Sequence, residues 1–347
     1  YRISPSYRAR TASAILRATT NHYLEPKTQD TMCLACQTQI DPDQMNAFGD
    51  RFVSLLNESS LGLMISVGYR TGLFEPMKEL PRPASSAAIA EADVVVHALH
   101  LRYDQWGDGR AEKQLQVVLD AMAGSGKTLL FPGTIYNYRA TDRTIAPGLR
   151  QSGEKPRGEI RIQLEQMLRD AAASNGFQVI ILRAGDFFGP GNRDEWFDAA
   201  MLMDYAKGRL YHLGDLETRH CWAYLPDLAR AFTVLAERRG SVQAFENFHF
   251  AGHWVSHGQI MAAIQNALPK PVKVAPLPWW MLRAVGLINP VMRDVYRMRY
   301  LWRNEMELVD PRLDALLGPD FTTAFEAAVA ETVTELVAGR ANQKQAA

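Results

Sequence analysis

The feature that most constrains the fold is a largely apolar run, FQVIILRAG, at residues 177–185, whose central residues VIIL are apolar at every position. A strand is apolar at every position, rather than at every second one, when it lies in a parallel sheet covered by helices on both faces. Helical patterns near 110–123 and over 159–174 separate this run from two similar ones, DVVVHAL and TLLFPG. Strands that alternate with helices in this way predict a doubly wound α/β sheet.

The alternation continues beyond this run and then ends. The segment LARAFTVLAERR predicts a helix, which we expect Asp227 to cap, and AFENFHFAG predicts another strand. Composition and periodicity divide the chain into four parts: a poorly structured leader at 1–44, a helical segment at 45–91, an α/β body at 92–255, and a mostly helical substrate-side region at 256–347.

The segment GSGKT at 124–128 resembles part of a phosphate-binding P-loop. That loop needs the pattern GxxxxGK[ST] between a strand and a helix. Here Ala121 stands at the first glycine position, and a helix precedes the segment while a strand follows it. We therefore expect Gly124 and Gly126 to end a helix and turn the chain into a strand.

Composition argues against several classes of protein. Lys plus Arg and Asp plus Glu are equal at 38 each, so no net charge favours nucleic acid or an anionic membrane. No apolar run approaches the roughly 20 residues of a membrane span, and we expect a cytoplasmic protein. Cys33 and Cys36 form a CxxC that lacks the other two ligands of a zinc site, and Cys221 lies in an apolar segment as a packed thiol. We therefore expect no metal.

Residues 1–24 contain arginine, serine and threonine but no acidic residue. This composition is typical of an organellar transit peptide, and equally of a disordered leader.

Four segments occur in a fixed order: ADVVVHAL (92–99), LLFPGTIYNY, LRAGDFFGPG (182–191) and HCWAYLPDLARAF. They resemble, in turn, the DVVxHxA fourth strand, the SSxxVYG fifth strand, the LRxxNxYGPG segment and the VxDxAxA segment of the extended short-chain dehydrogenases, the NAD(P)-dependent epimerase/dehydratase family. The resemblance extends over about 92–340. It implies a Rossmann-like sheet, NAD or NADP as cofactor, and oxidoreductase or epimerase chemistry.

That family carries out its chemistry with a Tyr-x-x-x-Lys pair and a Ser or Thr. Matching RGEIRIQLEQML to the family's YxxxKxxxExxL places Arg157 at the tyrosine and Arg161 at the lysine, and the Ser/Thr position falls on Pro132. Arg157 cannot shuttle a proton because guanidinium stays charged, whereas Arg161 can still bind a ribose or a phosphate. Thr134 and Tyr136 are the candidates for the catalytic roles instead. Alternatively, Thr134 is a turn residue and Tyr136 is the family's ordinary strand tyrosine.

The resemblance also implies positions for the cofactor and the substrate. The cofactor-binding positions are His97, Ala98, Leu99, Pro132, Arg161, Ala184 and Gly185. Asp186, which stands at the family's Asn, and Arg219 are the substrate candidates. Asp186 can instead cap a turn, and His97 can be a structural histidine at a strand end.

The segment upstream of Ala92 departs from the family, because no GxxGxxG turn precedes this residue. The family binds the cofactor pyrophosphate on that turn. Residues 45–91 instead resemble the helical N-terminal dimerisation module of class I S-adenosylmethionine methyltransferases. The α/β body is therefore expected to be an incomplete doubly wound sheet without its first βαβ half, and the 45–91 segment suggests a homodimer.

These patterns favour an NAD(P)-dependent epimerase/dehydratase-like oxidoreductase with altered catalytic residues. Its substrate would be a nucleotide sugar or another carbonyl or hydroxy compound. Two alternatives remain open at this point: a non-catalytic binding or regulatory protein that retains the fold, and a rearranged inactive gene product.

Overall fold

The architecture is that of a computed structural model. It describes residues 92–98, 101, 106–153, 155–191 and 195–346. The leader, the 45–91 segment, Leu99, Cys33 and Cys36 therefore lie outside the described residues.

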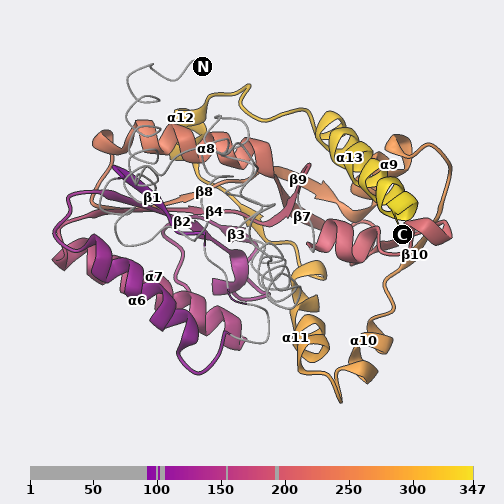
Figure 1. The fold of residues 1–347 in the computed structure, drawn as a ribbon, viewed down its shortest axis with the longest axis horizontal. Helices are drawn as coiled ribbons and strands as arrows, with labels where there is room; N and C mark the ends of the chain where they lie inside the picture. The colour runs from indigo at the N-terminus through magenta and orange to yellow at the C-terminus, as the bar shows by residue number, and fades with distance from the viewer. Residues whose placement is uncertain (1–91, 99–100, 102–105, 154, 192–194, 347) are drawn as a thin grey trace, which may run out of the picture.

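A parallel sheet of four strands forms the centre of the described part (Figure 1). Its strands are β1 (Val94–Val96), β2 (Thr128–Gly133), β4 (Gln178–Arg183) and β8 (Phe245–His249), in the spatial order β1-β2-β4-β8. Each neighbouring pair is parallel. This confirms the doubly wound α/β prediction for 92–255.

Helices cover both faces of this sheet, as Figure 1 shows. Helices α6 (Arg110–Met122) and α7 (Pro156–Ser174) lie on one face, and α8 (Leu225–Glu237) and α12 (Pro311–Leu317) on the other. Helix α7 begins three residues before the predicted start at 159, because Pro156 suits the first helical position, where no amide hydrogen bond is needed.

Successive side chains of the central strands enter two separate cores, because side chains alternate across a strand. Leu129 and Phe131 of β2 pack with α6 and α7, whereas Leu130 packs with α8. In β4, Val179 and Ile180 are each fully buried, on opposite faces. The apolar run at 177–185 is therefore a strand buried on both sides, as predicted.

The GSGKT segment is a turn. Gly124 and Gly126 have φ angles of 69° and 64°, which glycine adopts at little cost. Their amides donate to the carbonyl oxygens of Asn175 and Gly176, at 2.7 and 2.9 Å, so two loops that each precede a strand are joined. The prediction of a helix end and a turn, rather than a P-loop, is confirmed.

The prediction that Asp227 caps a helix is wrong. Helix α8 begins at Leu225, so Asp227 lies inside its first turn, and Tyr224 is the residue at the cap. The carboxylate of Asp227 accepts hydrogen bonds from the amide and the hydroxyl of Thr323, at 2.7 and 2.8 Å. It also pairs with Arg230 at 2.6 Å, and so it joins α8 to the chain that leads into the last helix.

A second, smaller sheet consists of β5 (Asp186–Phe188), β7 (Arg219–Tyr224) and β9 (His253–Ser256). Strands β5 and β7 are parallel, and β7 and β9 are antiparallel. Helices α9 (His257–Ala267) and α13 (Phe325–Ala346) pack together beside this sheet. Their shared core contains fully buried aromatic side chains, among them Trp222 and Trp302.

The remaining elements are short. Strands β6 (Arg209–His212) and β10 (Lys273–Pro276) pair in parallel, and so do β3 (Thr144–Ile145) and β11 (Glu307–Leu308). Helices α10 (Trp279–Val285) and α11 (Pro290–Met298) project from the body as a hairpin (Figure 1). Single helical turns are η2 (Ile135–Asn137), η3 (Trp196–Met201), η4 (Tyr205–Lys207), η5 (Arg239–Ser241) and η6 (Arg299–Trp302). Within the described ranges, no helix has the length and apolar character needed to cross a bilayer.

Candidate functional site

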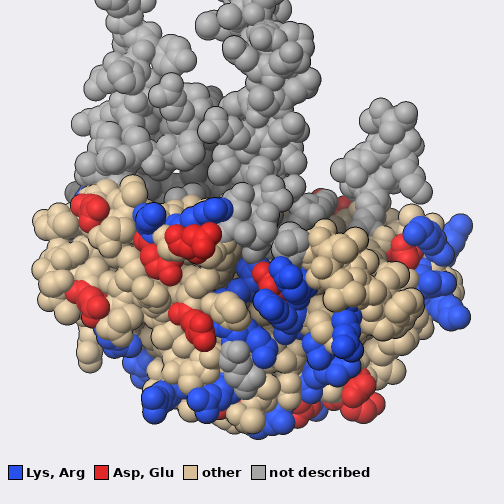
Figure 2. Space-filling model, turned by 90° about the horizontal axis from the view of Figure 1, so that it is seen from below, with Lys and Arg blue, Asp and Glu red and all other residues tan. Residues whose placement is uncertain are grey.

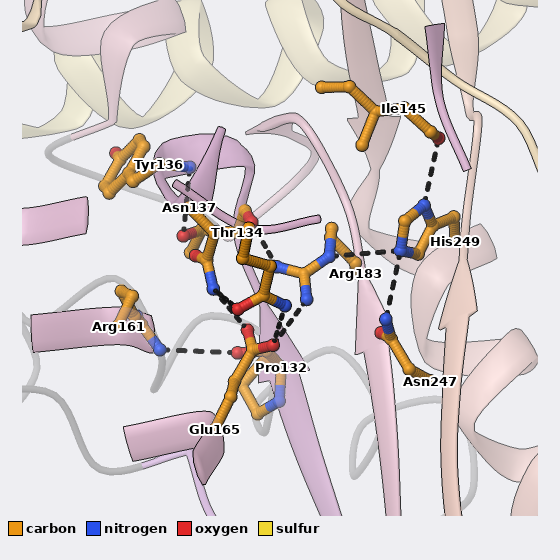
Figure 3. Close-up of polar contacts among 11 residues, drawn as sticks. Pro132, Thr134, Tyr136, Asn137, Ile145, Arg161, Glu165, Arg183, Asn247 and His249 are labelled. Atoms are coloured by element: carbon orange, nitrogen blue, oxygen red, sulfur yellow. Dashed lines mark hydrogen bonds and ion pairs between the residues drawn. The ribbon is translucent and has the colours of Figure 1, made fainter. Parts of the chain in front are cut away.

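The candidate site lies at the carboxyl ends of β1 and β2, where open parallel sheets bind their ligands. His97 follows β1, Pro132 lies near the end of β2, and Thr134 and Tyr136 follow β2 on the turn η2. Helix α7 begins beside this turn and supplies Arg157 and Arg161 on successive turns. Figure 3 shows Arg161 directed towards Pro132.

Arg161 lies beside the end of β2. Its Nη1 donates to the carbonyl oxygen of Pro132 at 3.4 Å, so the positions that correspond to the family's Lys and Ser/Thr meet in space. The guanidinium lies over the Trp106 ring at 4.7 Å and the Phe131 ring at 5.7 Å from their centroids. Such contacts hold a cation in a defined place without neutralising it.

Arg157 lies one turn earlier on α7 and is equally buried, at 5% exposure. Its Nη2 pairs with the carboxylate of Asp294 in α11 at 3.4 Å, and its guanidinium lies 5.4 Å from the Trp106 ring centroid. Trp106 therefore lies against both arginines. At the position of the family's tyrosine, this chain has a fixed cation that connects α7 to the C-terminal hairpin.

Gly158 explains why the start of α7 can lie so close to Tyr136. A Cβ at this glycine would collide with the backbone carbonyl of Tyr136, so only a residue without a side chain permits the contact. On the same turn, the Thr134 hydroxyl accepts a hydrogen bond from the Tyr136 amide at 3.4 Å. Both candidate hydroxyl groups are half-buried.

A small hollow lies just beyond the end of β1, between β2, α6 and α7. His97, Trp106, Phe131 and Arg161 are among its lining residues. His97 is 6% exposed, and neither ring nitrogen has a hydrogen-bond partner among the described residues. Burial, with a smaller effect of Arg161, lowers the pKa of His97 to about 4, so its imidazole is neutral at pH 7.

A buried polar network lies next to the site and holds the turn after β2 (Figure 3). Arg183 is fully buried and pairs with Glu165 of α7 at 2.7 Å, and its Nη1 donates to the Thr134 carbonyl. Asn137 and Gln151 donate to the same carboxylate at 2.9 and 2.6 Å. The network thus ties the turn after β2 to both β4 and α7.

His249 completes this network at the end of β8. Arg183 Nε donates to His249 Nε2 at 3.2 Å, and Asn247 lies 3.3 Å from the same nitrogen. Because Nε2 must accept, the proton of the neutral ring is on Nδ1, which donates to the Ile145 carbonyl at 3.0 Å. Burial, followed by the charge of Arg183, lowers the pKa of His249 to about 3, in agreement with this neutral state.

Sequence reasoning did not identify Arg183, Glu165, Asn137 or His249 as site residues. A signal was present, because an arginine at the end of a strand as apolar as QVIILR requires a buried partner. The YxxxKxxxExxL match also included Glu165. Their partnership was not visible, because it depends on how β4 packs against α7.

The two predicted substrate residues, Asp186 and Arg219, differ in their burial. Asp186 is buried, and its carboxylate lies 2.7 Å from Nε2 of His220, whose ring packs 4.2 Å from that of Trp302. Arg219 is exposed at the start of β7, and its amide donates to the Glu305 carboxylate at 3.1 Å. Thus Asp186 belongs to a buried acid–histidine pair, whereas Arg219 lies on the surface.

The remaining predicted cofactor positions have the small, buried character that a close approach requires. Ala98 and Ala184 are buried, at 5% and 1% exposure. Gly185 lies so close to the Cys221 carbonyl that a Cβ would collide with it. Within the described ranges, no group of three or more His, Cys, Asp or Glu side chains forms a metal site.

This geometry has a counterpart among known proteins. A family model described as the NAD dependent epimerase/dehydratase family matches residues 83–249. Over these residues the chain is similar to that family. The match covers all four strands of the central sheet and both arginines of α7.

Solved structures share the fold at low sequence identity. MoeE5 in complex with UDP-glucose and NAD matches with a TM-score of 0.59 and 14% identity, over 74% of this chain and 82% of that one. The UDP-glucuronic acid 4-epimerase of Bacillus cereus, in complex with UDP-glucuronic acid and NAD, gives 0.59 and 14%, over 77% and 86%. TunA, an NAD-dependent NDP-hexosamine 5,6-dehydratase, gives 0.53 and 17%, over 74% and 81%. Among curated proteins, none matches this sequence.

A second family model, described as an Rv2258c-like winged HTH domain, matches residues 59–103. Most of this segment lies outside the described residues. The resemblance of 45–91 to a methyltransferase dimerisation module therefore stays a prediction.

Proposed function

We propose that this chain is an NAD(P)-dependent oxidoreductase of the epimerase/dehydratase type whose substrate is a nucleotide sugar or a related carbonyl or hydroxy compound. The observation that carries the proposal is the contact of Arg161 with Pro132 at the carboxyl end of β2. This contact supports the proposal, because the motif match assigns Arg161 and Pro132 to the family's Lys and Ser/Thr positions. The similar structures were solved with NAD and UDP-sugars, which supports the substrate class.

The described residues fit the nicotinamide end of such a cofactor. His97 offers two ring nitrogens that have no hydrogen-bond partner among the described residues, and Arg161 offers a guanidinium that lies over the Trp106 and Phe131 rings. These groups would bind a ribose hydroxyl, an amide or a phosphate oxygen. The fit does not extend to the pyrophosphate, because no GxxGxxG turn precedes Ala92. When bound, NAD(P) would supply a hydride acceptor.

The chain's own residues would provide the proton transfer. Arg157 keeps its charge and therefore cannot exchange a proton near neutral pH. We infer that Tyr136, as the phenolate, accepts the proton of the substrate hydroxyl while NAD(P), when bound, would accept the hydride from the same carbon. The Thr134 hydroxyl would orient the substrate hydroxyl. Arg157, on the neighbouring turn of α7, would stabilise the phenolate by its charge. Asp186 and Arg219 are retained in this proposal as substrate contacts.

Calorimetric titration of the full chain with NAD, NADH, NADP and NADPH tests cofactor binding. We expect at least one of these nucleotides to bind. Arg161→Ala should weaken that binding by roughly 10- to 100-fold, which is the loss expected when one charge-assisted hydrogen bond is removed. Arg169→Ala is the matched control, because Arg169 lies on the same helix but packs over Phe245. Absence of heat with all four nucleotides would refute the proposal.

A non-catalytic binding protein is the second candidate function. It is favoured by Arg157, which fills the place of the proton-transferring tyrosine and is paired with Asp294. Turnover of a panel of UDP-sugars by the wild type and by Tyr136→Phe separates the two candidates. Turnover that falls at least about 100-fold in the variant supports catalysis. Nucleotide binding without any turnover supports the binding protein.

The further expectations of a homodimer, a cytoplasmic location and no nucleic-acid partner also stay predictions. The equal numbers of acidic and basic residues support the last of these. Light scattering of the purified chain would test the dimer.

A further inference from the structure

The α10–α11 hairpin presents apolar side chains to solvent. Eight large apolar side chains are exposed in the described part of the chain, and five of them fall within residues 280–288. Trp280, Leu287 and Ile288 are the most exposed, at 74%, 82% and 89%. A contiguous apolar patch of this kind marks a binding surface rather than ordinary surface scatter.

The backbone of the hairpin holds these side chains outward. Gly286 packs so closely against α11 that a Cβ there would lie 2.9 Å from the Arg293 Cα. The Ile288 amide donates to the Val285 carbonyl at 3.1 Å, and the Asn289 side chain caps α11 by accepting from the Met292 amide at 3.2 Å. The tip is therefore preformed, so little conformational entropy is lost when it binds a partner.

Positive charge surrounds this apolar tip. Residues 277–304 contain five arginines and one acidic residue, although the whole chain has no net charge. The single acid, Asp294, is already paired with Arg157 and Arg297. Arg283 and Arg293 are exposed. Figure 2 views the molecule from the side on which the hairpin projects, and it shows Lys and Arg side chains gathered over the centre and right of that face.

We propose that the α10–α11 hairpin is a docking site for an anionic phospholipid surface. Exposed Trp and aliphatic side chains beside arginines are the combination that binds the interface of an anionic bilayer, where rings and aliphatic groups enter the headgroup region and cations pair with phosphates. A second copy of this face would bring arginines against arginines, which disfavours a symmetric dimer through it.

The hairpin is also fastened to the body beside the candidate site. Arg157 of α7 pairs with Asp294 of α11, and the Lys155 ammonium lies 6.0 Å from the centroid of the Tyr300 ring just after α11. A membrane bound at the hairpin would therefore lie near the end of α7 that carries the site. The equal numbers of basic and acidic residues in the whole chain argued against binding to an anionic membrane, because acidic residues elsewhere in the chain balance the positive charge of the hairpin.

Co-sedimentation of the full chain with vesicles tests the proposal. We expect binding to vesicles of phosphatidylcholine mixed with phosphatidylglycerol, weaker binding to phosphatidylcholine alone, and loss of binding at high salt. The Leu287→Asp/Ile288→Asp double variant should bind roughly tenfold or more weakly. Arg283→Gln/Arg293→Gln should lose most of the preference for the anionic vesicles.

Val117→Asp is the matched control, because Val117 is an apolar side chain of α6 with 66% exposure outside the hairpin. It should bind vesicles as the wild type does. The proposal is overturned if the wild type ignores both kinds of vesicle, or if Leu287→Asp/Ile288→Asp binds as well as Val117→Asp. It is equally overturned if light scattering shows a dimer that only the hairpin variant dissociates. Vesicle binding needs no nucleotide, so this result is independent of the cofactor titration.

Discussion

The buried Arg183–Glu165 pair offers a sharp test of how this site is held together. The Glu165 carboxylate accepts hydrogen bonds from Arg183, Gln151 and Asn137 at 2.7, 2.6 and 2.9 Å. The substitution Glu165→Gln retains the size of the side chain but removes its charge. Arg183 would then keep only neutral acceptors, the Thr134 carbonyl among them.

The magnitude follows from burial. Arg183 is fully buried and Glu165 is 5% exposed, so water cannot replace the lost counter-ion. Removing one partner of such a pair costs about 3–5 kcal/mol, a large part of the roughly 5–15 kcal/mol that stabilises a folded domain. Lys207 and Asp204 form an ion pair of nearly the same length, 2.8 Å, but the Lys207 side chain is 78% exposed. Removing that pair should change the free energy of unfolding far less, because water screens its charges.

Urea unfolding of the full chain, followed by circular dichroism, measures both effects. Glu165→Gln should lower the free energy of unfolding by about 3–5 kcal/mol, and Asp204→Asn should lower it far less. The double variant Glu165→Gln/Arg183→Met should lose less than the sum of its single variants, because no unpaired charge remains buried. If Glu165→Gln unfolds within about 1 kcal/mol of the wild type, or the double variant shows simple additivity, the reasoning is refuted.

Two further predictions concern buried titratable groups. Burial and Arg183 lower the pKa of His249 to about 3, from about 6.5 in the unfolded chain, so the unfolded state binds an extra proton below about pH 6.5. The free energy of unfolding should therefore fall as pH drops from about 6.5 towards 3, by up to about 1.4 kcal/mol per pH unit from this group. His249→Gln should flatten the pH dependence of the urea midpoint. An unchanged slope in this variant would contradict the assignment. Burial raises the pKa of the Cys221 thiol to about 12. In a Cys33→Ser/Cys36→Ser variant, a thiol reagent at neutral pH should therefore label Cys221 only as fast as the chain unfolds. Rapid labelling in native buffer would show that Cys221 is accessible.

Part of the candidate site could be predicted because it follows from local sequence. The strand TLLFPG and the helical pattern of 159–174 are each legible from a short window. Motif spacing singled out Arg161 and Pro132, which a hydrogen bond joins in the structure. Asp227 was misplaced for an equally local reason. Pro226 allows α8 to start before the acid, and the partner of that acid, Thr323, lies 96 residues away.

By itself, the sequence determined that the segments of the central sheet become strands, that helices separate them, and which of these strands are covered on both faces. The reason is that apolar periodicity records burial residue by residue. It also determined that Arg157 is no proton shuttle, because the charge of guanidinium does not depend on the fold. Only the tertiary structure decided which charges pair. Glu165 meets Arg183 because α7 crosses β4, and Asp294 meets Arg157 although 137 residues separate them. The apolar tip on the hairpin is likewise a tertiary result, because WWMLRAVGLI would suit a buried helix equally well until packing leaves it exposed.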